Sequence, residues 1–238
     1  MTVDGKDVKE VYGVEQWNVS LACSNISNAS EWTTGAALPF MVEGTAGLKT
    51  IKVTVMIRGT SRDNIWKKTE AFVAKLIRPC EIQLDGFEHR FYMFLKNVTQ
   101  TEISLNRYHK ATLELTGYEY GEEVQISSTA KNIAVNNPGT LLTPAVIEIT
   151  PVINLASLTV GGLVRDRFID VDKPIVISNL INGKKIIIDG ETGIVTQAGV
   201  NKFSEISLRD LPTLKPGANA VTVDKDVQMT IKFKPLYF

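Results

Sequence analysis

Alternation of apolar and polar residues recurs in nearly every segment of the chain and constrains its fold more than any other feature. The alternation is clearest near the C-terminus, where four apolar residues are each separated by one polar residue: Val227, Met229, Ile231 and Phe233. Residues two positions apart lie on the same face of a strand, so such segments indicate half-buried strands. The sequence therefore predicts an all-β protein.

One helix interrupts the strands, at about residues 62–77. Its apolar residues recur at helical spacing and are predicted to form one stripe: Ile65, Trp66, Thr69, Phe72, Val73 and Leu76. Thr60, followed three residues later by Asp63, predicts a capping box at the start of the helix. Arg78-Pro79 is expected to end it, because proline disfavours helical geometry in the residue before it.

The first half otherwise consists of predicted strands on both sides of this helix. They lie at 49–57, 81–84, 87–95, 99–105 and 110–117. Asp85-Gly86 separates two of them and predicts a two-residue hairpin, because both residues tolerate a positive φ. A polar turn at Asn106–His109 separates the last two strands.

A polar segment at 121–144, rich in turn-forming residues, predicts a connector with a domain boundary near its start. The first domain is then expected to span 1–126 and the second 127–238. The second domain shows short strands at regular spacing, at 145–150, 156–160, 173–178, 184–188, 193–196, 204–208, 220–223 and 227–233. Asn182-Gly183 and Asp189-Gly190 predict hairpins. Many short strands with frequent turns predict a β-sandwich of the jelly-roll type.

Charge is balanced in both halves, with 14 basic and 16 acidic residues in 1–126 and 12 basic and 10 acidic residues in 127–238. A protein that grips phosphates carries a positive excess, so we expect no tight binding to nucleic acid. No segment has the apolar length of a membrane helix or the pattern of a signal peptide, so we expect synthesis in the cytoplasm and no membrane insertion. Cys23 and Cys80 are expected to be reduced and buried.

No arrangement of residues predicts catalysis. The two histidines are expected apart from each other, His89 within the 87–95 strand and His109 in a turn, and neither lies near a nucleophile elbow. Three carboxylates near a strand end, Asp166, Asp170 and Asp172, favour a solvated edge, with a surface calcium site as the alternative. Gly161-Gly162 is expected to form a hairpin or bulge. We therefore expect no enzyme, with no catalytic, cofactor-binding or metal-binding residue.

Sugar binding by the second domain is disfavoured by the distribution of aromatic residues. Sugar sites commonly stack an aromatic ring on the apolar face of the pyranose. All three tryptophans, Trp17, Trp32 and Trp66, fall in the first half. This distribution favours a role in protein docking.

Several short motifs, in order and spacing, resemble the siphophage distal tail protein (Dit) family along nearly the whole chain. They follow the β-rich first domain with its single helix and the polar connector: NNPGT at 136–140, IEI at 147–149, IDG at 188–190, GIV at 193–195, PGAN at 216–219 and KPLY at 234–237.

The resemblance implies a structural virion protein at the tail tip or baseplate, without catalytic residues. It implies a ring-forming first domain that assembles as a homohexamer around the path of the DNA, and a galectin-like second domain that projects outward. The implied partners are the tail tube protein, the tail-associated tip protein and, in some phages, receptor-binding proteins or their adaptors. Ring formation requires strand edges, and we expect the 49–57 strand to offer one.

Three alternatives remain at this point. A carbohydrate-binding module would show affinity of residues 127–238 for host polysaccharide. A hydrolase of host wall polymers would need a carboxylate pair, which the sequence alone does not exclude. A major tail tube protein would form stacked rings, but the second domain favours a terminal ring.

Overall fold

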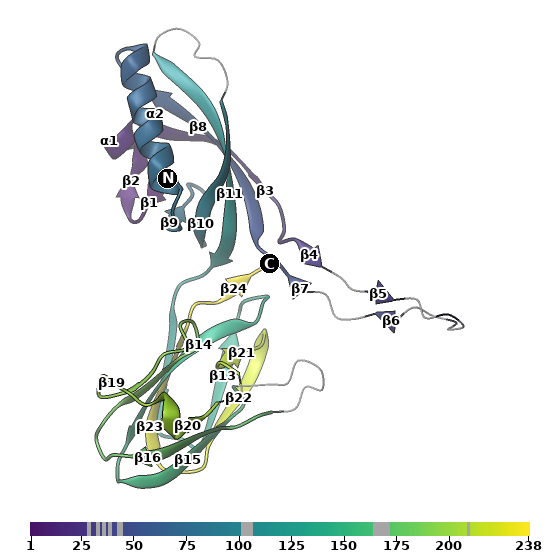
Figure 1. The fold of residues 1–238 in the computed structure, drawn as a ribbon, viewed down its shortest axis with the longest axis vertical. Coiled ribbons are helices and arrows are strands. Elements are labelled where there is room, and N and C mark those ends of the chain that lie inside the picture. The colour runs from purple at the N-terminus through teal and green to yellow at the C-terminus, as the bar shows by residue number, and fades with distance from the viewer. Residues whose placement is uncertain are drawn as a thin grey trace. The chain divides into compact units, whose positions relative to one another are not determined.

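The computed structural model describes residues 1–27, 30–31, 34, 37, 40–41, 45–100, 107–163, 172–208 and 210–238. The chain divides into two compact units, Met1–Tyr120 with Phe238, and Gly121–Tyr237 (Figure 1). The expected domain boundary after residue 126 lies inside β12 (Val124–Ser128), a strand that pairs with β23 of the second unit. Among the described residues, no helix is both long and apolar enough to cross a membrane.

The first unit is built on one antiparallel sheet. Its strands follow the order β2-β1-β9-β10-β11-β8-β3. Their bounds are β1 (Thr2–Val3), β2 (Lys6–Asp7), β3 (Val14–Leu21), β8 (Lys49–Arg58), β9 (Cys80–Gln83), β10 (Arg90–Gln100) and β11 (Tyr108–Tyr120). Two short pairs, β4 (Ile26–Ser27) with β7 (Thr45–Ala46) and β5 (Ser30–Glu31) with β6 (Phe40–Met41), form a two-stranded extension beyond β3 and β8 (Figure 1).

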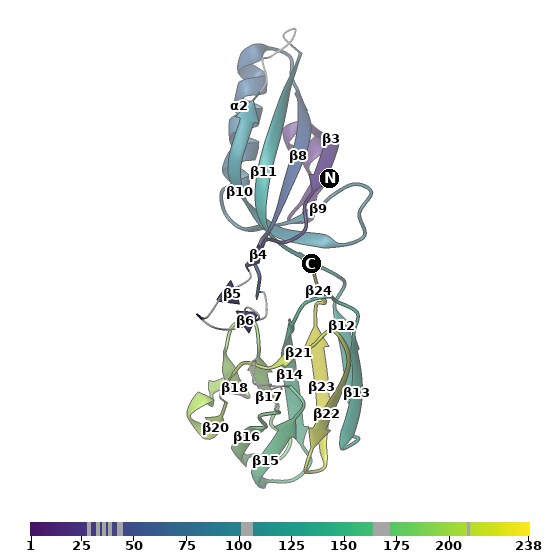
Figure 2. The ribbon, with the colours of Figure 1, turned by 90° about the vertical axis from the view of Figure 1, so that its right-hand side faces the viewer.

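Helix α2 (Arg62–Leu76) lies along one face of this sheet (Figure 2). The buried face of β8 is the alternating set Ile51, Val53, Val55 and Ile57, as the sequence pattern indicates. From the helix, Ile65, Thr69, Phe72 and Leu76 pack against the sheet. The predicted stripe was wrong in one respect: Trp66 is 41% exposed and is not part of the buried face of the helix. A short helix, α1 (Val8–Tyr12), precedes β3.

The start of α2 differs from the predicted capping box. Ser61, not Thr60, is the N-cap: its backbone is extended and its hydroxyl accepts a hydrogen bond from the N–H of Asn64 at 3.2 Å. The Asn64 side chain in turn accepts from the N–H of Thr60 at 3.3 Å. Asp63 pairs instead with Lys67 one turn later, at 2.8 Å.

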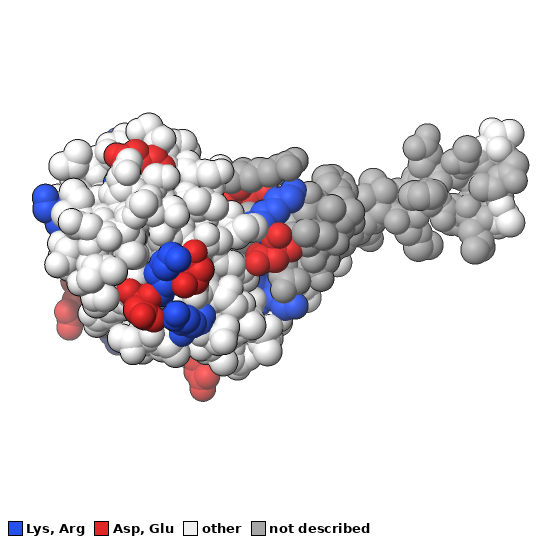
Figure 3. Space-filling model, turned by 90° about the horizontal axis from the view of Figure 1, so that it is seen from below, with Lys and Arg blue, Asp and Glu red and all other residues white. Residues whose placement is uncertain are grey.

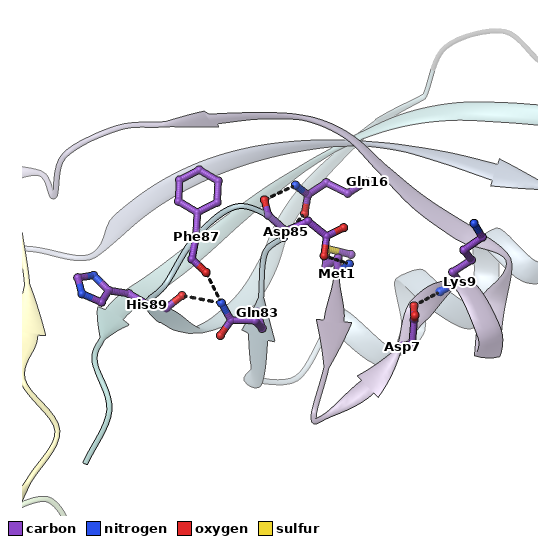
Figure 4. Close-up of polar contacts among 8 residues, drawn as sticks. All are labelled: Met1, Asp7, Lys9, Gln16, Gln83, Asp85, Phe87 and His89. Atoms are coloured by element: carbon purple, nitrogen blue, oxygen red, sulfur yellow. Dashed lines mark hydrogen bonds and ion pairs between the residues drawn. The ribbon is translucent and has the colours of Figure 1, made fainter. Parts of the chain in front are cut away.

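The Asp85-Gly86 connection is longer than the predicted two-residue hairpin, because β9 ends at Gln83 and β10 begins at Arg90. Only Gly86 has a positive φ, +84°, so the pair does not form the type I′ turn that such a hairpin needs. The loop is held by neighbouring polar groups (Figure 4). Gln16 donates to the Asp85 carbonyl and accepts from its N–H, each at 3.0 Å, and the Asp85 carboxylate accepts from the Met1 amino group at 2.5 Å.

The second unit is a sandwich of two antiparallel sheets (Figure 2). One has the order β12-β23-β14-β17-β18-β19, with β21 also paired to β14, and the other has the order β13-β22-β15-β16-β20. Its elements are β12 (Val124–Ser128), β13 (Asn132–Asn137), β14 (Thr143–Pro151), β15 (Leu155–Gly161), β16 (Ile175–Leu180), β17 (Ile186–Asp189), β18 (Val195–Gln197), β19 (Val200–Asn201), η1 (Phe203–Glu205), β20 (Ile206–Ser207), β21 (Thr213–Leu214), β22 (Gly217–Val223), β23 (Val227–Phe233) and β24 (Leu236–Tyr237). The inward residues of both sheets form one core. The predicted all-β class with one substantial helix is therefore confirmed.

The predicted connector at 121–144 was wrong, because it contains β12, β13 and the start of β14. Two apolar residues of β13, Ile133 and Val135, alternate with polar ones and are buried. The third inward residue is Asn137, whose amide donates to the Thr143 hydroxyl at 3.1 Å. Because Asn137 is polar although it occupies a core position, the alternation did not indicate the β13 strand.

The two predicted hairpins of this unit have different outcomes. Asp189-Gly190 does connect paired strands, β17 and β18, and the Asp189 carboxylate accepts from the N–H groups of Glu191 and Thr192 at 2.8 and 3.2 Å. The Asn182-Gly183 hairpin was wrong. The strands on either side, β16 and β17, belong to different sheets, so this turn crosses the sandwich.

Candidate functional site: an open sheet with two free edges

In the first unit, the strands β10, β11, β8 and β3 have α2 on one face, and no other described element covers their opposite face. The central strand β8 pairs on one side with β11 from Lys49 to Arg58 and on the other with β3 from Ile51 to Ile57. The expectation that the 49–57 strand offers an edge was therefore wrong. Both of its edges are already used by neighbours distant in sequence.

The free edges belong to β3 and β10. Among the described residues, β3 pairs only with β8, and β9 covers β10 only from Arg90 to Met93. Beyond Met93 the outer edge of β10 has no strand partner in the described chain. An unpaired edge presents a row of backbone N–H and C=O groups that another strand can bind.

Each free edge carries a bulge. The register of β3 against β8 shifts between Gln16 and Asn18, and that of β10 against β11 shifts between Leu95 and Asn97. A bulge bends its strand and increases the local twist, and bulges occur preferentially at sheet edges and barrel rims. The two edges thus flank a curved sheet, as β8 and β11 show in Figure 1.

The face of these strands opposite α2 is polar. Hydroxyl groups meet across β8 and β11, with Thr54 Oγ1 3.2 Å from Thr112 Oγ1 and Thr50 Oγ1 3.4 Å from Thr116 Oγ1. Between them Glu114 stands opposite Lys52 and binds Lys96 at 3.3 Å. The same rows continue onto the edge strands with Asn18, Ser20, Asn97 and Thr99. We call this surface the open face.

Aromatic side chains are exposed at the borders of the open face. Trp17, at the β3 bulge, is 64% exposed, and the Lys110 ammonium lies 6.0 Å from its ring centroid. Tyr92 and Tyr118 lie with their ring centroids 5.6 Å apart, and Phe94 is exposed where the free edge of β10 begins. Exposed aromatic residues beside an unpaired edge are typical of a protein–protein interface.

A buried ion cluster closes one end of the sheet. Glu119 of β11 binds Lys49 of β8 and accepts from His89 Nδ1 at 2.7 Å. Burial would raise the pKa of Glu119, but the hydrogen bonds from Lys49 and His89 outweigh it and hold that pKa below its ordinary value. Beside this cluster, Tyr120 donates to Glu81; burial and the Glu81 charge raise the pKa of Tyr120.

The structure places both histidines differently from expectation. His89 lies in the segment before β10, not within a strand, and binds Glu119. His109 lies within β11, opposite Ile57 on the face beneath α2, not in a turn. It is 1% exposed, and neither of its ring nitrogens has a hydrogen-bond partner among the residues that the structure describes. The predicted strand began only at residue 110, because the apolar–polar alternation breaks at His109. The imidazole occupies an inward position that an apolar residue usually holds.

The other residues considered from sequence do not assemble into a site. The expected burial of Cys23 was wrong, because its side chain is exposed. Cys80 is buried against the Met93 carbonyl, and burial raises the pKa of its thiol to about 11. Asp166 and Asp170 lie outside the described residues, and both Asp172 oxygens accept from the Gly162 N–H at 2.9 Å. No group of three metal-ligating side chains occurs among the described residues.

The second unit carries mixed charges on its surface. Figure 3 shows basic and acidic side chains interspersed on the end of this unit that lies at the bottom of Figure 1. On the outer side of β14, Glu148 binds Lys185 at 2.7 Å and Lys232 at 2.6 Å, and these two hydrogen bonds lower its pKa.

Comparison with known proteins supports the expected resemblance. Residues 138–237 match the family model described as the siphovirus-type tail component, C-terminal domain. The crystal structure of the phage SPP1 Dit protein, described as a paradigm of the hub of the adsorption apparatus in phages that infect Gram-positive bacteria, is similar over 99% of this chain and 98% of that chain. Its TM-score is 0.79 and its sequence identity 17%.

A second similar structure is a chain of the phage P2 baseplate in its activated conformation with calcium. The similarity covers 93% of this chain and 90% of that chain, with a TM-score of 0.51 and 13% identity. No curated protein matches the sequence. The resemblance to the Dit family, drawn from short motifs, is confirmed, and the shared fold covers both units.

Proposed function

We propose that this chain is the distal tail protein of a siphophage, a structural virion component that forms the hub between the tail tube and the tail tip or baseplate. The observation that carries this proposal is the similarity to the SPP1 Dit fold over 99% of the chain, together with the tail-component match of residues 138–237. A fold shared over the whole chain supports the same organisation in two units, in which the first unit forms the ring and the second unit binds other tail proteins.

The first unit forms the ring. Its free edges, on β3 and β10, lie on opposite sides of the four-stranded sheet, so β3 of one copy can pair with β10 of the next. Such head-to-tail contacts use two different surfaces of each copy and generate a closed ring when the rotation between copies closes. Closure at six copies is the number that the resemblance implies. Pairing would also bury Trp17 and Phe94, which border the two edges.

The open face lines the bore. In a ring closed by edge pairing, each sheet has one face inward and one outward, and α2 already covers one of them. The remaining face carries hydroxyl and amide groups together with charged residues, several of them paired: Glu114 binds Lys96 and stands opposite Lys52, and Glu15 binds Arg58. Affinity for DNA comes largely from counterions that are released when cationic side chains neutralise phosphates. Because few charges on the open face are unpaired, little of this affinity is expected, and DNA can pass without tight binding.

The protein acts by assembly and not by catalysis. Its histidines serve a buried ion cluster and the core beneath α2, and the described residues contain no metal-ligating group. The partners we propose are further copies in the ring, the tail tube protein, the tail-associated tip protein and, for the second unit, receptor-binding proteins or their adaptors. Its location is then the tail tip of the virion.

Molar mass in solution, combined with negative-stain electron microscopy, tests the proposal. Light scattering should give six times the 26.2 kDa of one chain for the purified protein, or that mass plus the bound partners after mixing with tail tube and tip proteins. Images of the same fraction should show rings with an open centre. A protein that stays monomeric with both partners present would contradict the ring.

A further inference from the structure

The second unit has a free edge that the ring does not use. β13 (Asn132–Asn137) is the outermost strand of its sheet and pairs with β22 along its whole length, from Asn132 opposite Thr222 to Asn137 opposite Gly217. Its register has no shift. On its other side no strand pairs with it in the part of the chain that the structure describes.

This edge lacks the features that usually protect an edge from pairing. Proteins shorten their edge strands, place charges or proline on them, or interrupt them with bulges. The opposite edge of the same sheet, β20, has two residues, and so does the edge strand β19 of the other sheet. β13 has six residues in the sequence NIAVNN, without charge, proline or bulge.

The surface beside β13 carries no charged side chain among its strand residues. Ala134 stands opposite Ala220, and Asn136 opposite Ala218, and all four are exposed. The outward residues of the next strands, β15 and β16, are Ser157, Thr159, Val176 and Ser178. The surface beside β12, the edge strand of the other sheet, is charged instead: the outer face of that sheet carries Glu148, Lys185 and Lys232.

We propose that β13 is the docking strand for an extended segment of a different tail protein, a segment that is uncharged where it pairs. Backbone hydrogen bonds of such an added strand supply affinity, and the small side chains beside it leave room for larger side chains of the partner. The absence of charge at the edge favours an uncharged partner segment, since an unpaired charge brought to this surface would lose water without gaining a counterion.

A second copy of the chain does not fit this edge, an argument that rests on the proposed ring. Antiparallel pairing of β13 with itself needs a two-fold axis, and the two-fold axis of a six-membered ring runs along the bore. Head-to-tail pairing with the far edge of the same sheet would offer only the two residues of β20. Pairing with β12, the edge strand of the other sheet, would bring Lys232, which lies opposite Gln125, beside an edge that carries no charge. The occupant is therefore a different chain.

Photo-crosslinking in assembled virions tests the inference. Benzoylphenylalanine is placed at Asn136, on the outward face of β13, and in a matched control at Ser207, on the opposite edge of the same sheet. After irradiation of purified virions, the adducts are identified by mass spectrometry. We expect an adduct between position 136 and a different tail protein, and no such adduct from position 207.

A second variant separates docking from folding. Ala134→Lys adds a charge to the β13 edge, and Ser207→Lys adds the same charge to the far edge. In the position-136 background, Ala134→Lys should abolish the adduct while the purified protein keeps its ring mass, and Ser207→Lys should leave both unchanged. Adducts only with a second copy, no adduct at 136, or an adduct that survives Ala134→Lys would overturn the inference. Virions that lack the protein altogether would instead contradict the proposed function.

Discussion

The two units differ in how the faces of their β-sheets are buried. In the second unit two sheets bury each other's inner faces, so the core is complete within one chain. In the first unit α2 covers one face of the sheet, the other face stays open, and β3 and β10 end in free edges. The core of the second unit is therefore complete within one chain, whereas in the proposed ring the free edges of the first unit pair with neighbouring copies. Mutations should separate stability, which depends on both cores, from assembly, which depends on the edges.

The largest effect is expected in the core of the second unit. Ile147→Ala removes a fully buried side chain of β14 and should lower the free energy of unfolding of that unit by about 2–5 kcal/mol. Ile187→Ala, on the half-exposed outer face of β17, is the matched control and should cost clearly less. Urea titration followed by circular dichroism measures the change.

The same titration shows whether the two units are independent. All three tryptophans lie within the first unit, so their fluorescence follows the unfolding of that unit alone. Ile147→Ala should shift the circular dichroism transition and leave the fluorescence transition in place. A parallel shift of both would show that the units unfold together.

The next effect concerns assembly. Trp17→Ala should weaken each contact between copies by about 2–4 kcal/mol, the range of an interface hot spot, while the isolated fold stays intact. Trp66→Ala, on the outer side of α2, removes an equally large exposed ring away from both edges. Analytical ultracentrifugation should show ring dissociation for Trp17→Ala alone, and equal losses in the two variants would refute the role of the β3 edge.

An intermediate effect is expected in the buried ion cluster. Glu119→Gln removes the carboxylate that binds the buried Lys49 ammonium, which keeps only its hydrogen bond to the Phe238 main-chain oxygen at 3.0 Å, and should cost about 1–3 kcal/mol at neutral pH. Because the folded pKa of Glu119 lies below its ordinary value of 4.5, its stabilisation is present above that value and is lost as the pH falls through the lowered pKa. The fluorescence-detected midpoints of wild type and variant should therefore converge in acid, and a difference that persists there would exclude this cause.

The smallest effect is expected on the open face. Thr54→Val keeps the strand shape and removes a hydroxyl that bonds Thr112 at the surface, so the free energy of unfolding should change by less than about 0.5 kcal/mol. Ring mass should also be unchanged, because β8 is not an edge. A loss of more than about 2 kcal/mol would mean that the open face is covered in solution, contrary to a bore-lining role.

Strands were predictable where apolar and polar residues alternate, and the helix was predictable where apolar residues recur at helical spacing. The 227–233 strand has the predicted bounds, and α2 differs from prediction by its last residue. Pairing was not predictable, because the neighbours of β8 lie far from it in sequence. β8 was expected to be an edge for this reason, and the free edges of β3 and β10 became visible only once the sheet order was known.

Polar residues at inward positions account for the other differences. Asn137 and His109 occupy core positions. Asn137 concealed β13, and His109 concealed only the first residues of β11, which was predicted to begin at residue 110. Asn137 is satisfied by hydrogen bonds that depend on the turn after β13, a tertiary feature that no local pattern indicates. The open face was not predictable from sequence, because its residues come from four strands.

Crosslinking across the two edges tests the central claim most directly. In a Cys23→Ser background, Ser20→Cys on β3 and Thr99→Cys on β10 are combined and treated with a short bismaleimide. Pairing of β3 with β10 of the next copy predicts a ladder of products that ends at six chains, whereas each single variant gives no ladder. Absence of products beyond a dimer from the double variant, in protein that forms rings, would show that the ring is closed by other surfaces.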